Sequence, residues 1–237
     1  MNIPTLVILQ ARMSSRRLPG KVLLTLNDKP IIYWQIKRIL RAKSITKLVV
    51  AISVHPSDDI LANYLDEIAQ KYIRGPLDNV LERFIQANKL YNPQSIVRIT
   101  GDCPFVMPEI IDSVVNLFNE TKYDYVSNVV DLTFPDGLDV EVFKANILEK
   151  LMNYPLTCAE KEHVTLGILN RKDDFIIGNY SNSKNLSHYR WTVDTAEDYN
   201  FVSKIFANFR SSEVAFTFND IQRFIENNPG INQIKRK

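Results

Sequence analysis

Apolar positions follow two periodicities along the first half of the chain. Two apolar runs of strand length, TLVILQ (5–10) and KLVVAIS (47–53), flank the segment PIIYWQIKRILRA, in which apolar residues recur at helical spacing. SIVRIT (95–100) and DYVSNVV (124–130) are further strand candidates. Strands that alternate with helices through short connections predict a parallel sheet that is covered on both faces.

Three further segments have the apolar spacing of amphipathic helices. They are SDDILANYLDEIAQKY (57–72), LDNVLERFIQANKLY (77–91) and PEIIDSVVNLFNE (108–120). Ser57 precedes the first apolar residue of its segment, so we predict that it caps that helix. The first half therefore predicts an α/β fold.

The pattern becomes less regular after residue 130. A turn, FPDG, precedes the strand candidate LDVEVF (138–143), and FIIGNY (175–180) and YRWTVDT (189–195) also have the composition of strands. The chain closes with two helical patterns, TAEDYNFVSKIFANF and NDIQRFIENN. Because no repeat or long linker interrupts the sequence, we predict a single domain over residues 1–237, with a β-rich segment inserted at about 131–190.

Composition narrows the classes of partner. The chain has 29 basic and 27 acidic residues, so it has no general positive field for nucleic acid, and any anion must bind to a local cluster. The two cysteines, Cys103 and Cys158, form neither a disulfide framework nor a metal-binding pattern. We expect a cytoplasmic protein without a signal peptide and without insertion into a membrane.

One loop concentrates positive charge. Arg12, Arg16, Arg17 and Lys21 lie in LQARMSSRRLPGKVL (9–23), and no acidic residue occurs before Asp28. The loop follows the first strand, and open α/β sheets bind ligands beyond the carboxyl ends of their strands. Serine and glycine let backbone N–H groups approach an anion, and the cations supply charge-assisted bonds, so the loop fits either a triphosphate or a solvated basic surface. It matches neither GxxxxGK[ST] nor GxGxxG.

The segment ARMSSRRLPGK resembles the nucleotide-binding signature of cytidylyltransferases that make CMP-activated sugars. These include the CMP-Kdo and acylneuraminate synthetases, and the resemblance is greatest to the spore-coat polysaccharide biosynthesis type. RGPLDNVLERF, VRITGDCPFVMPEIID, FPDGLDVEVF, EKEHVT and SHYRWTVDTAED follow in the order of that group. The chain departs from the pattern at Ser14, where glycine is usual, at Arg16, where threonine is usual, and at Met107, where aspartate is usual.

The resemblance implies a Rossmann-like nucleotide-diphospho-sugar transferase fold. Such a fold has a mostly parallel sheet, helices on both faces and an inserted β-rich arm for the acceptor and for dimer contact, so a homodimer is expected. The implied reaction is CTP-dependent transfer of CMP to a sugar or sugar acid, with Mg²⁺ as cofactor and pyrophosphate as product, for surface polysaccharide or glycan synthesis.

Other functions stay open at this point. They are nucleotidyl transfer to a non-sugar alcohol or a phosphonate, and glycosyl transfer from a nucleotide sugar. Glycosyltransferases usually carry a DxD pair near the middle of the sheet, where this chain has only GDC. A non-catalytic nucleotide-binding module is disfavoured because Lys21, Asp102 and Asp194 occur together.

Two aspartates are candidate metal ligands. Asp102 follows SIVRIT and Asp194 ends YRWTVDT, so both stand at predicted strand ends that could meet at one edge of the sheet. Mg²⁺ is commonly held by one or two carboxylates together with phosphates and water, and in the family pattern these two positions carry the metal. Asp198 is expected on a helix surface. By the same resemblance, Arg12, Lys21 and Asp102 are the catalytic candidates.

The remaining candidates fall into two sets. The resemblance assigns nucleotide binding to Leu9, Ala11, Arg12, Ser14, Ser15, Arg17, Lys21, Arg74, Asp78, Asn79 and Arg83, although Asn79 and Arg83 also fit the exposed face of a helix. The acceptor set comprises Asn128, Asp139, Glu141, Glu160, Glu162, His163 and Arg190. Asp139 and Glu141 share one strand face by period two, which fits either a pocket or an exposed surface. Arg190 could bind a substrate carboxylate or form a structural ion pair.

Overall fold

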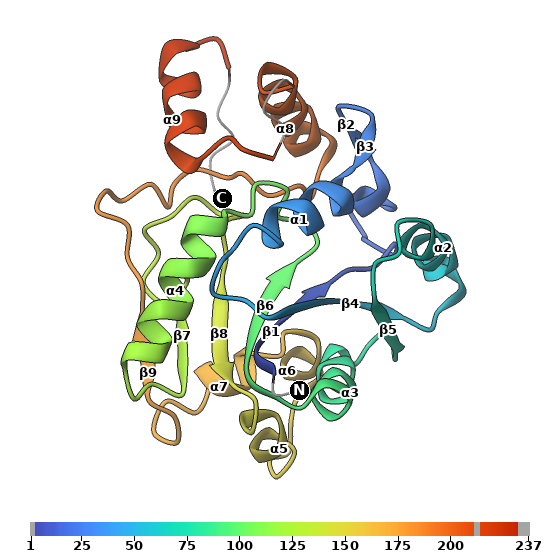
Figure 1. Ribbon diagram of the computed structural model, residues 1–237, viewed down its shortest axis with the longest axis vertical. Coiled ribbons are helices and arrows are strands. Elements are labelled where there is room, and N and C mark those ends of the chain that lie inside the picture. Colours follow the sequence, from blue (N-terminus) through green and yellow to red (C-terminus); the bar gives the residue numbers. More distant parts are fainter. Residues whose placement is uncertain (1–2, 211–213, 232–237) are drawn as a thin grey trace.

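A seven-stranded sheet forms the centre of the protein. The computed structural model describes residues 3–210 and 214–231. The strand order is β5-β4-β1-β6-β8-β7-β9, and within the described residues β8 alone runs against the others (Figure 1). The strands are β1 (Ile3–Gln10), β4 (Lys47–Ser53), β5 (Tyr72–Gly75), β6 (Pro93–Thr100), β7 (Tyr125–Ser127), β8 (Glu141–Lys144) and β9 (Ile177–Asn179), with a separate hairpin of β2 (Thr25–Leu26) and β3 (Lys29–Pro30).

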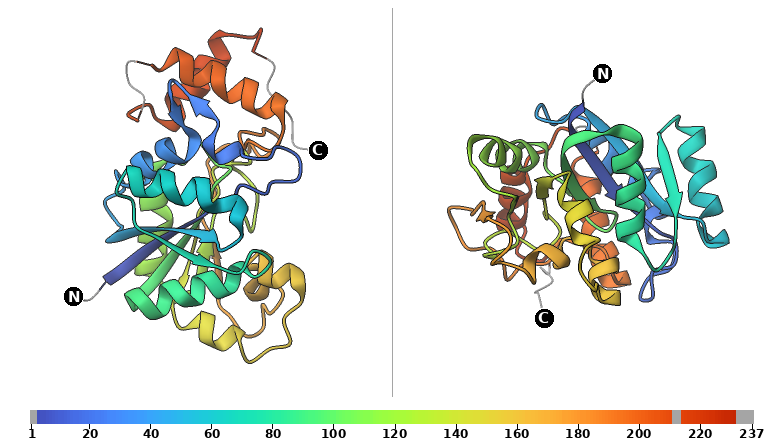
Figure 2. Two further views of the ribbon diagram at one scale, coloured as in Figure 1. Left: turned by 90° about the vertical axis from the view of Figure 1, so that its right-hand side faces the viewer. Right: turned by 90° about the horizontal axis from the view of Figure 1, so that it is seen from below.

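Helices cover both faces of this sheet. The α-helices are α1 (Ile31–Ile39), α2 (Asp59–Glu67), α3 (Val80–Tyr91), α4 (Pro108–Glu120), α5 (Ile147–Leu151), α6 (Cys158–Glu162), α7 (Leu166–Leu169), α8 (Ala196–Asn208) and α9 (Phe218–Asn227), and two 3₁₀ turns are η1 (Lys21–Leu23) and η2 (Pro56–Asp58). Figure 2 shows α2 and α3 on opposite sides of the strands. In the described residues, no helix is long and apolar enough to span a membrane.

The alternation along β1 explains the two layers. Val7 and Leu9 belong to a core cluster with α1, α2, α4, α8 and α9, whereas Leu6 and Ile8 belong to a second cluster with α3 and α5. All four side chains are fully buried, because a central parallel strand is covered on both faces. The predicted parallel sheet with two helical layers is therefore confirmed.

The segment 131–190 joins the central sheet. β8 lies between β6 and β7, and β9 pairs with β7, so both strands of the segment extend the main sheet and three short helices, α5 to α7, make up the rest of its regular structure. Instead of a β-rich arm, the segment thus forms one flank of the same sheet.

The predicted strand YRWTVDT is wrong. Trp191 and Val193 are buried, which gives the alternation of a strand, but their backbone N–H groups donate to Asp136 O (2.7 Å) and Asp102 O (2.8 Å). The segment forms an isolated β-bridge, between Arg190 and Asp136, and belongs to no strand. The segment is therefore an extended stretch of chain that hydrogen-bonds to the loops of Asp136 and Asp102. Because Val193 donates to Asp102, the next residue, Asp194, lies beside the Asp102 loop.

The start and end of α2 also differ from the prediction. The turn η2 precedes the helix, and Asp58 occupies the N-cap position predicted for Ser57. Asp58 is fully buried, and its carboxylate instead accepts hydrogen bonds from the backbone N–H groups of Met13 and Ser53, both at 2.8 Å. The helix ends early because Ala69 adopts a left-handed conformation (φ 53°). The chain then enters β5, which was not predicted because the helical pattern extends to residue 72.

Candidate active site

A polar cleft of about 410 Å³ opens beyond the carboxyl ends of β1 and β6. The basic loop forms one wall, and residues of α3 and of the α6 end form the other. Its lining residues are Gln10, Ala11, Arg12, Ser15, Arg16, Arg17, Lys21, Val22, Val80, Arg83, Arg98, Thr100, Gly101, Asp102, Glu162, His163 and Asp194.

Backbone hydrogen bonds fold the basic loop into a compact turn. The carbonyl of Met13 accepts from the N–H groups of Ser15 (3.0 Å) and Gly20 (2.8 Å), and the N–H of Met13 is held by Asp58. Gly20 has φ 74°, a left-handed conformation that favours glycine. Ser14 is absent from the residues with positive φ, so serine replaces the usual glycine there without backbone strain.

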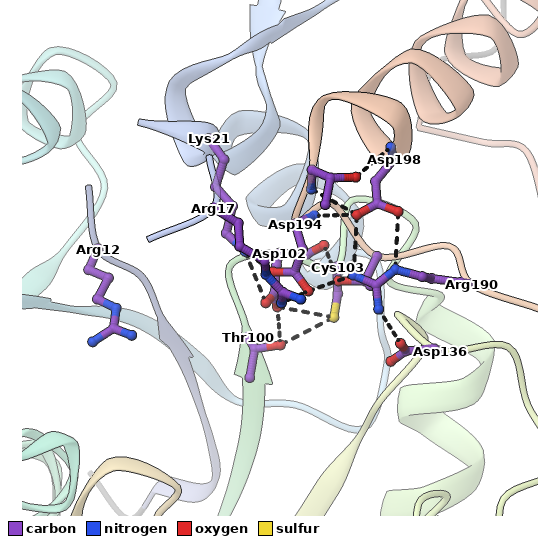
Figure 3. A network of polar contacts seen from close by, with 12 residues as sticks. Arg12, Arg17, Lys21, Thr100, Asp102, Cys103, Asp136, Arg190, Asp194 and Asp198 are labelled. Atoms are coloured by element: carbon purple, nitrogen blue, oxygen red, sulfur yellow. Dashed lines mark hydrogen bonds and ion pairs between the residues drawn. The ribbon is translucent and has the colours of Figure 1, made fainter. Parts of the chain in front are cut away.

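Lys21 joins the two predicted metal ligands. Its Nζ donates to Asp102 Oδ2 at 3.1 Å and to Asp194 Oδ1 at 2.8 Å (Figure 3). Thr100 donates to the second oxygen of Asp102 at 2.6 Å, and Arg17 Nη2 lies 2.6 Å from the second oxygen of Asp194. The two carboxylates therefore meet on one ammonium group, close enough to share an ion.

The protein keeps this cluster charged. Burial disfavours the charged form of Lys21, but the two carboxylates outweigh burial and raise its pKa. Burial likewise opposes the charge on Asp102 and Asp194, and the contacts with Lys21 more than compensate, so the pKa of each carboxyl is lowered. A cation and two anions thus stand at the floor of the cleft at neutral pH.

The carboxylates fit a magnesium ion that a nucleotide would help to bind. Within the described residues, no group of three His, Cys, Asp or Glu side chains could hold a metal ion. Two neighbouring carboxylates are the usual protein contribution to Mg²⁺, since phosphates and water supply the other ligands. Asp102 and Asp194 would hold the ion in this arrangement.

Arg190 is enclosed by carboxylates. It donates to Asp136 (3.0 Å) and Asp194 (2.7 Å), and its Nε lies 3.1 Å from Asp198 Oδ1. Arg190 thus forms the structural ion pairs that the sequence left open as the alternative to acceptor binding. Asp198 is 1% exposed rather than on a helix surface, because it caps α8 with Thr195.

The acceptor candidates separate into two groups. Glu162 and His163 line the cleft, where Glu162 accepts a hydrogen bond from Arg12 at 2.8 Å. Figure 3 shows Arg12 apart from the Lys21 cluster, on the opposite side of the site. Asp139 is half-buried outside the cleft lining, and burial, aided by neighbouring carboxylates, raises its pKa to about 7.

Three other acceptor candidates have structural partners. Asn128 is buried and bridges Leu138 O and Val140 N, both at 2.8 Å. Glu160 is buried in the capping box of α6 and pairs with Arg171. Glu141 is buried against Arg98 and Tyr125. The period-two pattern left a pocket and an exposed surface open for Glu141, and the structure buries it against these partners and outside the cleft lining.

Six of the nucleotide candidates line the cleft, namely Ala11, Arg12, Ser15, Arg17, Lys21 and Arg83. Arg83 is 1% exposed and donates to Ala51 O, so its alternative placement on an exposed helix face is wrong. The others lie outside the cleft lining: Leu9 is in the core, Ser14 is in the loop, Arg74 pairs with Asp59, Asp78 is exposed and Asn79 caps α3.

Gln10 and Arg98 were missed, although a signal for both was present. Each is a polar residue in a strand whose neighbours are apolar, which is unusual for a buried strand. Gly101 was also missed; a Cβ there would meet Gln10 O at 3.0 Å, so glycine allows β1 and β6 to end side by side. Arg16 was one of the four cations that marked the basic loop, whereas Val22, Val80 and Thr100 carried no signal of their own.

Comparison with known proteins links this site to one enzyme family. A family model described as cytidylyltransferase matches residues 6–232. The chain is 33% identical over 208 residues to the spore coat polysaccharide biosynthesis protein SpsF of Bacillus subtilis, covering 85% of each protein. It is 31% identical over 229 residues to an uncharacterized protein of Methanocaldococcus jannaschii, covering 96% of this chain and 92% of that protein.

Solved structures agree with the sequence comparison. A cytidylyltransferase structure from Leptospira borgpetersenii aligns with a TM-score of 0.93 at 31% identity, covering 100% of this chain and 99% of that one. The structure of CMP:2-keto-3-deoxy-manno-octonic acid synthetase complexed with CTP aligns with a TM-score of 0.68 at 16% identity, covering 86% and 99% of the two chains. The second likeness concerns the fold.

Proposed function

The chain belongs to the cytidylyltransferase family, and from this premise we propose that it transfers CMP from CTP to a sugar or sugar acid. Pyrophosphate is the second product, and the activated sugar serves the synthesis of a surface polysaccharide or glycan. Membership makes the protein a nucleotidyltransferase. The observation that carries the proposal is the contact of Lys21 with both Asp102 and Asp194 beneath the basic loop.

The relatives support the nucleotide and the type of acceptor. The name of the Bacillus subtilis relative connects it with a spore coat polysaccharide. The more distant synthetase with the same fold was solved with CTP, and its name specifies an octonic acid. In this chain, the cleft offers cations to a triphosphate and the polar side chains of Glu162 and His163 to a hydroxylated acceptor.

The reaction is displacement at the α-phosphorus of CTP. The oxygen of an acceptor hydroxyl forms the new bond to the α-phosphorus, and its proton is released to solvent. The bond from the α-phosphorus to the oxygen that bridges it to the β-phosphate breaks, and pyrophosphate leaves with that oxygen. Arg12, Arg17 and the loop amides bind the phosphates, and Lys21 neutralises charge that develops on them. Asp102 and Asp194 would hold Mg²⁺, which when bound would supply positive charge to offset the negative charge of the phosphates.

The setting of the enzyme is part of the same proposal. We propose Mg²⁺ as the cofactor, a cytoplasmic location, which the free Cys103 and Cys158 fit, and a homodimer. The segment 131–190 supports dimer contact because Leu132 and Ile176 leave apolar side chains exposed on it.

A pyrophosphate-release assay tests the proposal. Each of four nucleoside triphosphates is offered with Mg²⁺ and a panel of neutral sugars, octulosonic acids and nonulosonic acids, with Lys21→Ala as the inactive control. We expect release with CTP and at least one sugar or sugar acid. Equal turnover of all four nucleotides, or release with non-sugar alcohols alone, would contradict the proposal.

A further inference from the structure

A row of polar side chains crosses the sheet beneath the cleft. Gln10 of β1 accepts a hydrogen bond from Arg98 Nε of β6 at 2.9 Å. The guanidinium of Arg98 also pairs with Glu141 of β8, and the second carboxylate oxygen of Glu141 accepts from Tyr125 Oη of β7 at 2.8 Å. Four adjacent strands are thus joined by side chains on the sheet face that packs against α3 and α5.

This row is expensive to bury. The side chains of Arg98 and Glu141 are 9% and 6% exposed. On the same face, the apolar Ile8 lies directly opposite Arg98 on β1, and the next pair into the core is Ile96 with Phe143. A buried ion pair adds little net stability compared with apolar residues of the same size. Since the row reaches the cleft at Gln10 and Arg98, its position favours a role in the site.

The partner of Gln10 fixes the orientation of its amide. Arginine offers only donors, so the oxygen of the Gln10 amide must face Arg98. The NH₂ group therefore points away from Arg98, and no described residue accepts a hydrogen bond from it. Gln10 is half-buried and lines the cleft, which leaves a donor with a fixed direction at the cleft surface.

We propose that Gln10 selects the base of the nucleotide by donating to an acceptor atom of the cytosine ring. Gln10 lies two residues before Arg12, at the start of the loop proposed for the triphosphate, and the neighbouring Ala11 and Val80 give the cleft apolar surface suited to a base. Cytosine presents an acceptor at N3, where uracil presents an N–H donor that opposes the Gln10 NH₂ group.

Arg98 acts as a positioning residue in this proposal. Held by Glu141 on its other side, it prevents the Gln10 amide from turning over and offering its oxygen to uracil. The inference rests on the proposed use of CTP and adds to it the side chains that recognise the base.

Calorimetric titration with CTP and with UTP, in Mg²⁺ and without acceptor, tests the inference. For Gln10→Leu we expect the Kd of CTP to rise about tenfold, the scale of one lost hydrogen bond, with a much smaller change for UTP. For Arg98→Lys, which keeps the charge beside Glu141, we expect a several-fold loss of CTP-over-UTP preference in a cooperatively folded protein. Gln86→Leu on α3, outside the cleft lining, is the matched control and should change neither affinity.

The outcomes separate this inference from the proposed function. If the wild-type protein binds no CTP, the proposed function fails. If the wild type binds CTP and Gln10→Leu binds it equally well, or if CTP and UTP weaken by the same factor, recognition of the base by Gln10 is overturned while the transferase proposal stands. Should Arg98→Lys fail to fold, Gln10→Leu alone decides the result.

Discussion

Two groups of charged residues reach the same cleft, and they differ in how many partners each charged side chain contacts and in how exposed it is. In the Lys21 cluster, Asp194 contacts Lys21, Arg17 and Arg190, and side-chain exposure increases from 10% for Lys21 and 15% for Asp194 to 30% for Asp102 and 63% for Arg17. In the Arg98 row, Arg98 and Glu141 form one ion pair and are almost fully buried. Shared, partly solvated contacts can be exchanged for phosphate oxygens or a metal ion, whereas a buried pair holds its geometry.

The comparison therefore assigns chemistry to one group and positioning to the other. Removing a charge should reduce turnover in the Lys21 cluster and reduce folding stability in the Arg98 row. The predictions below test this division, beginning with the largest expected effect.

Arg98→Met should destabilise the fold most. It leaves the carboxylate of Glu141 buried without its cation, and breaking a buried ion pair commonly costs about 3–5 kcal/mol in the free energy of unfolding. Urea denaturation followed by circular dichroism measures the loss. The double variant Arg98→Met/Glu141→Met should recover much of it; a double variant as unstable as the single one would mean that the row supports the fold by more than its charges.

Lys21→Ala should act mainly on turnover. Removing one group that stabilises charge in the transition state commonly raises the barrier by about 2.7–4 kcal/mol, a fall of roughly 10²–10³ in kcat. The fold should persist because Arg17 and Arg190 still contact Asp194. Steady-state pyrophosphate release and thermal melting are compared for the same preparation, and normal turnover in the folded variant would end the assignment of Lys21.

The first half of the fold could be predicted because local pattern and final structure agree there. The run TLVILQ becomes β1, and the helices predicted at 77–91 and 108–120 form α3 and α4. YRWTVDT was wrongly predicted as a strand because alternating buried side chains do not show where the backbone hydrogen bonds go. Backbone N–H groups of this segment donate to the carbonyls of Asp136 and Asp102, which lie in loops.

The sequence predicted those site residues that lie close together in one motif. It did not predict contacts between residues that are far apart in the sequence. The motif resemblance identified Arg12 and Lys21, and their place at the end of β1 follows from the sheet. The enclosure of Arg190 by Asp136, Asp194 and Asp198 depends on how the chain folds from Arg190 into α8 and on how the remote loop of Asp136 meets it, which spacing along the chain does not specify. The pairing of Gln10 with Arg98 likewise needs the register of β1 against β6.

Asp139 provides a pH test beside both groups. Its pKa is raised to about 7 by burial and by neighbouring carboxylates, so the native state holds its proton more tightly than the unfolded chain does. The stability from this group is fully present below about pH 4 and is lost as the pH rises through 7. Asp139→Asn should therefore stabilise the protein at pH 8, by roughly 2 kcal/mol after allowance for partial exposure, and have little effect at pH 4.

Urea unfolding of both proteins at pH 4, 6 and 8 measures this effect. The variant should lose the fall in stability that the wild type shows between pH 4 and 8. An equal gain at all three values would mean that asparagine packs better there and that the charge of Asp139 is not responsible.

The smallest effect is expected at Glu162, whose carboxylate holds Arg12 across the cleft at 2.8 Å. The two side chains are 36% and 42% exposed, and such a pair contributes about 0.2–1 kcal/mol to stability, so Glu162→Gln should unfold almost as the wild type does. The exchange leaves Arg12 free for phosphate and removes one negative charge from a cleft proposed to bind a triphosphate. We therefore expect CTP to bind about twofold to fivefold more tightly, with the gain shrinking as salt screens the charges.

Calorimetry at low and high ionic strength measures the gain in CTP affinity and its dependence on salt. Glu67→Gln, at the end of α2 and outside the cleft lining, is the control for an altered net charge. Weaker CTP binding by Glu162→Gln would place Glu162 among the groups that hold the nucleotide, and the Arg12 contact would then belong with the fixed pairs instead of the exchangeable ones.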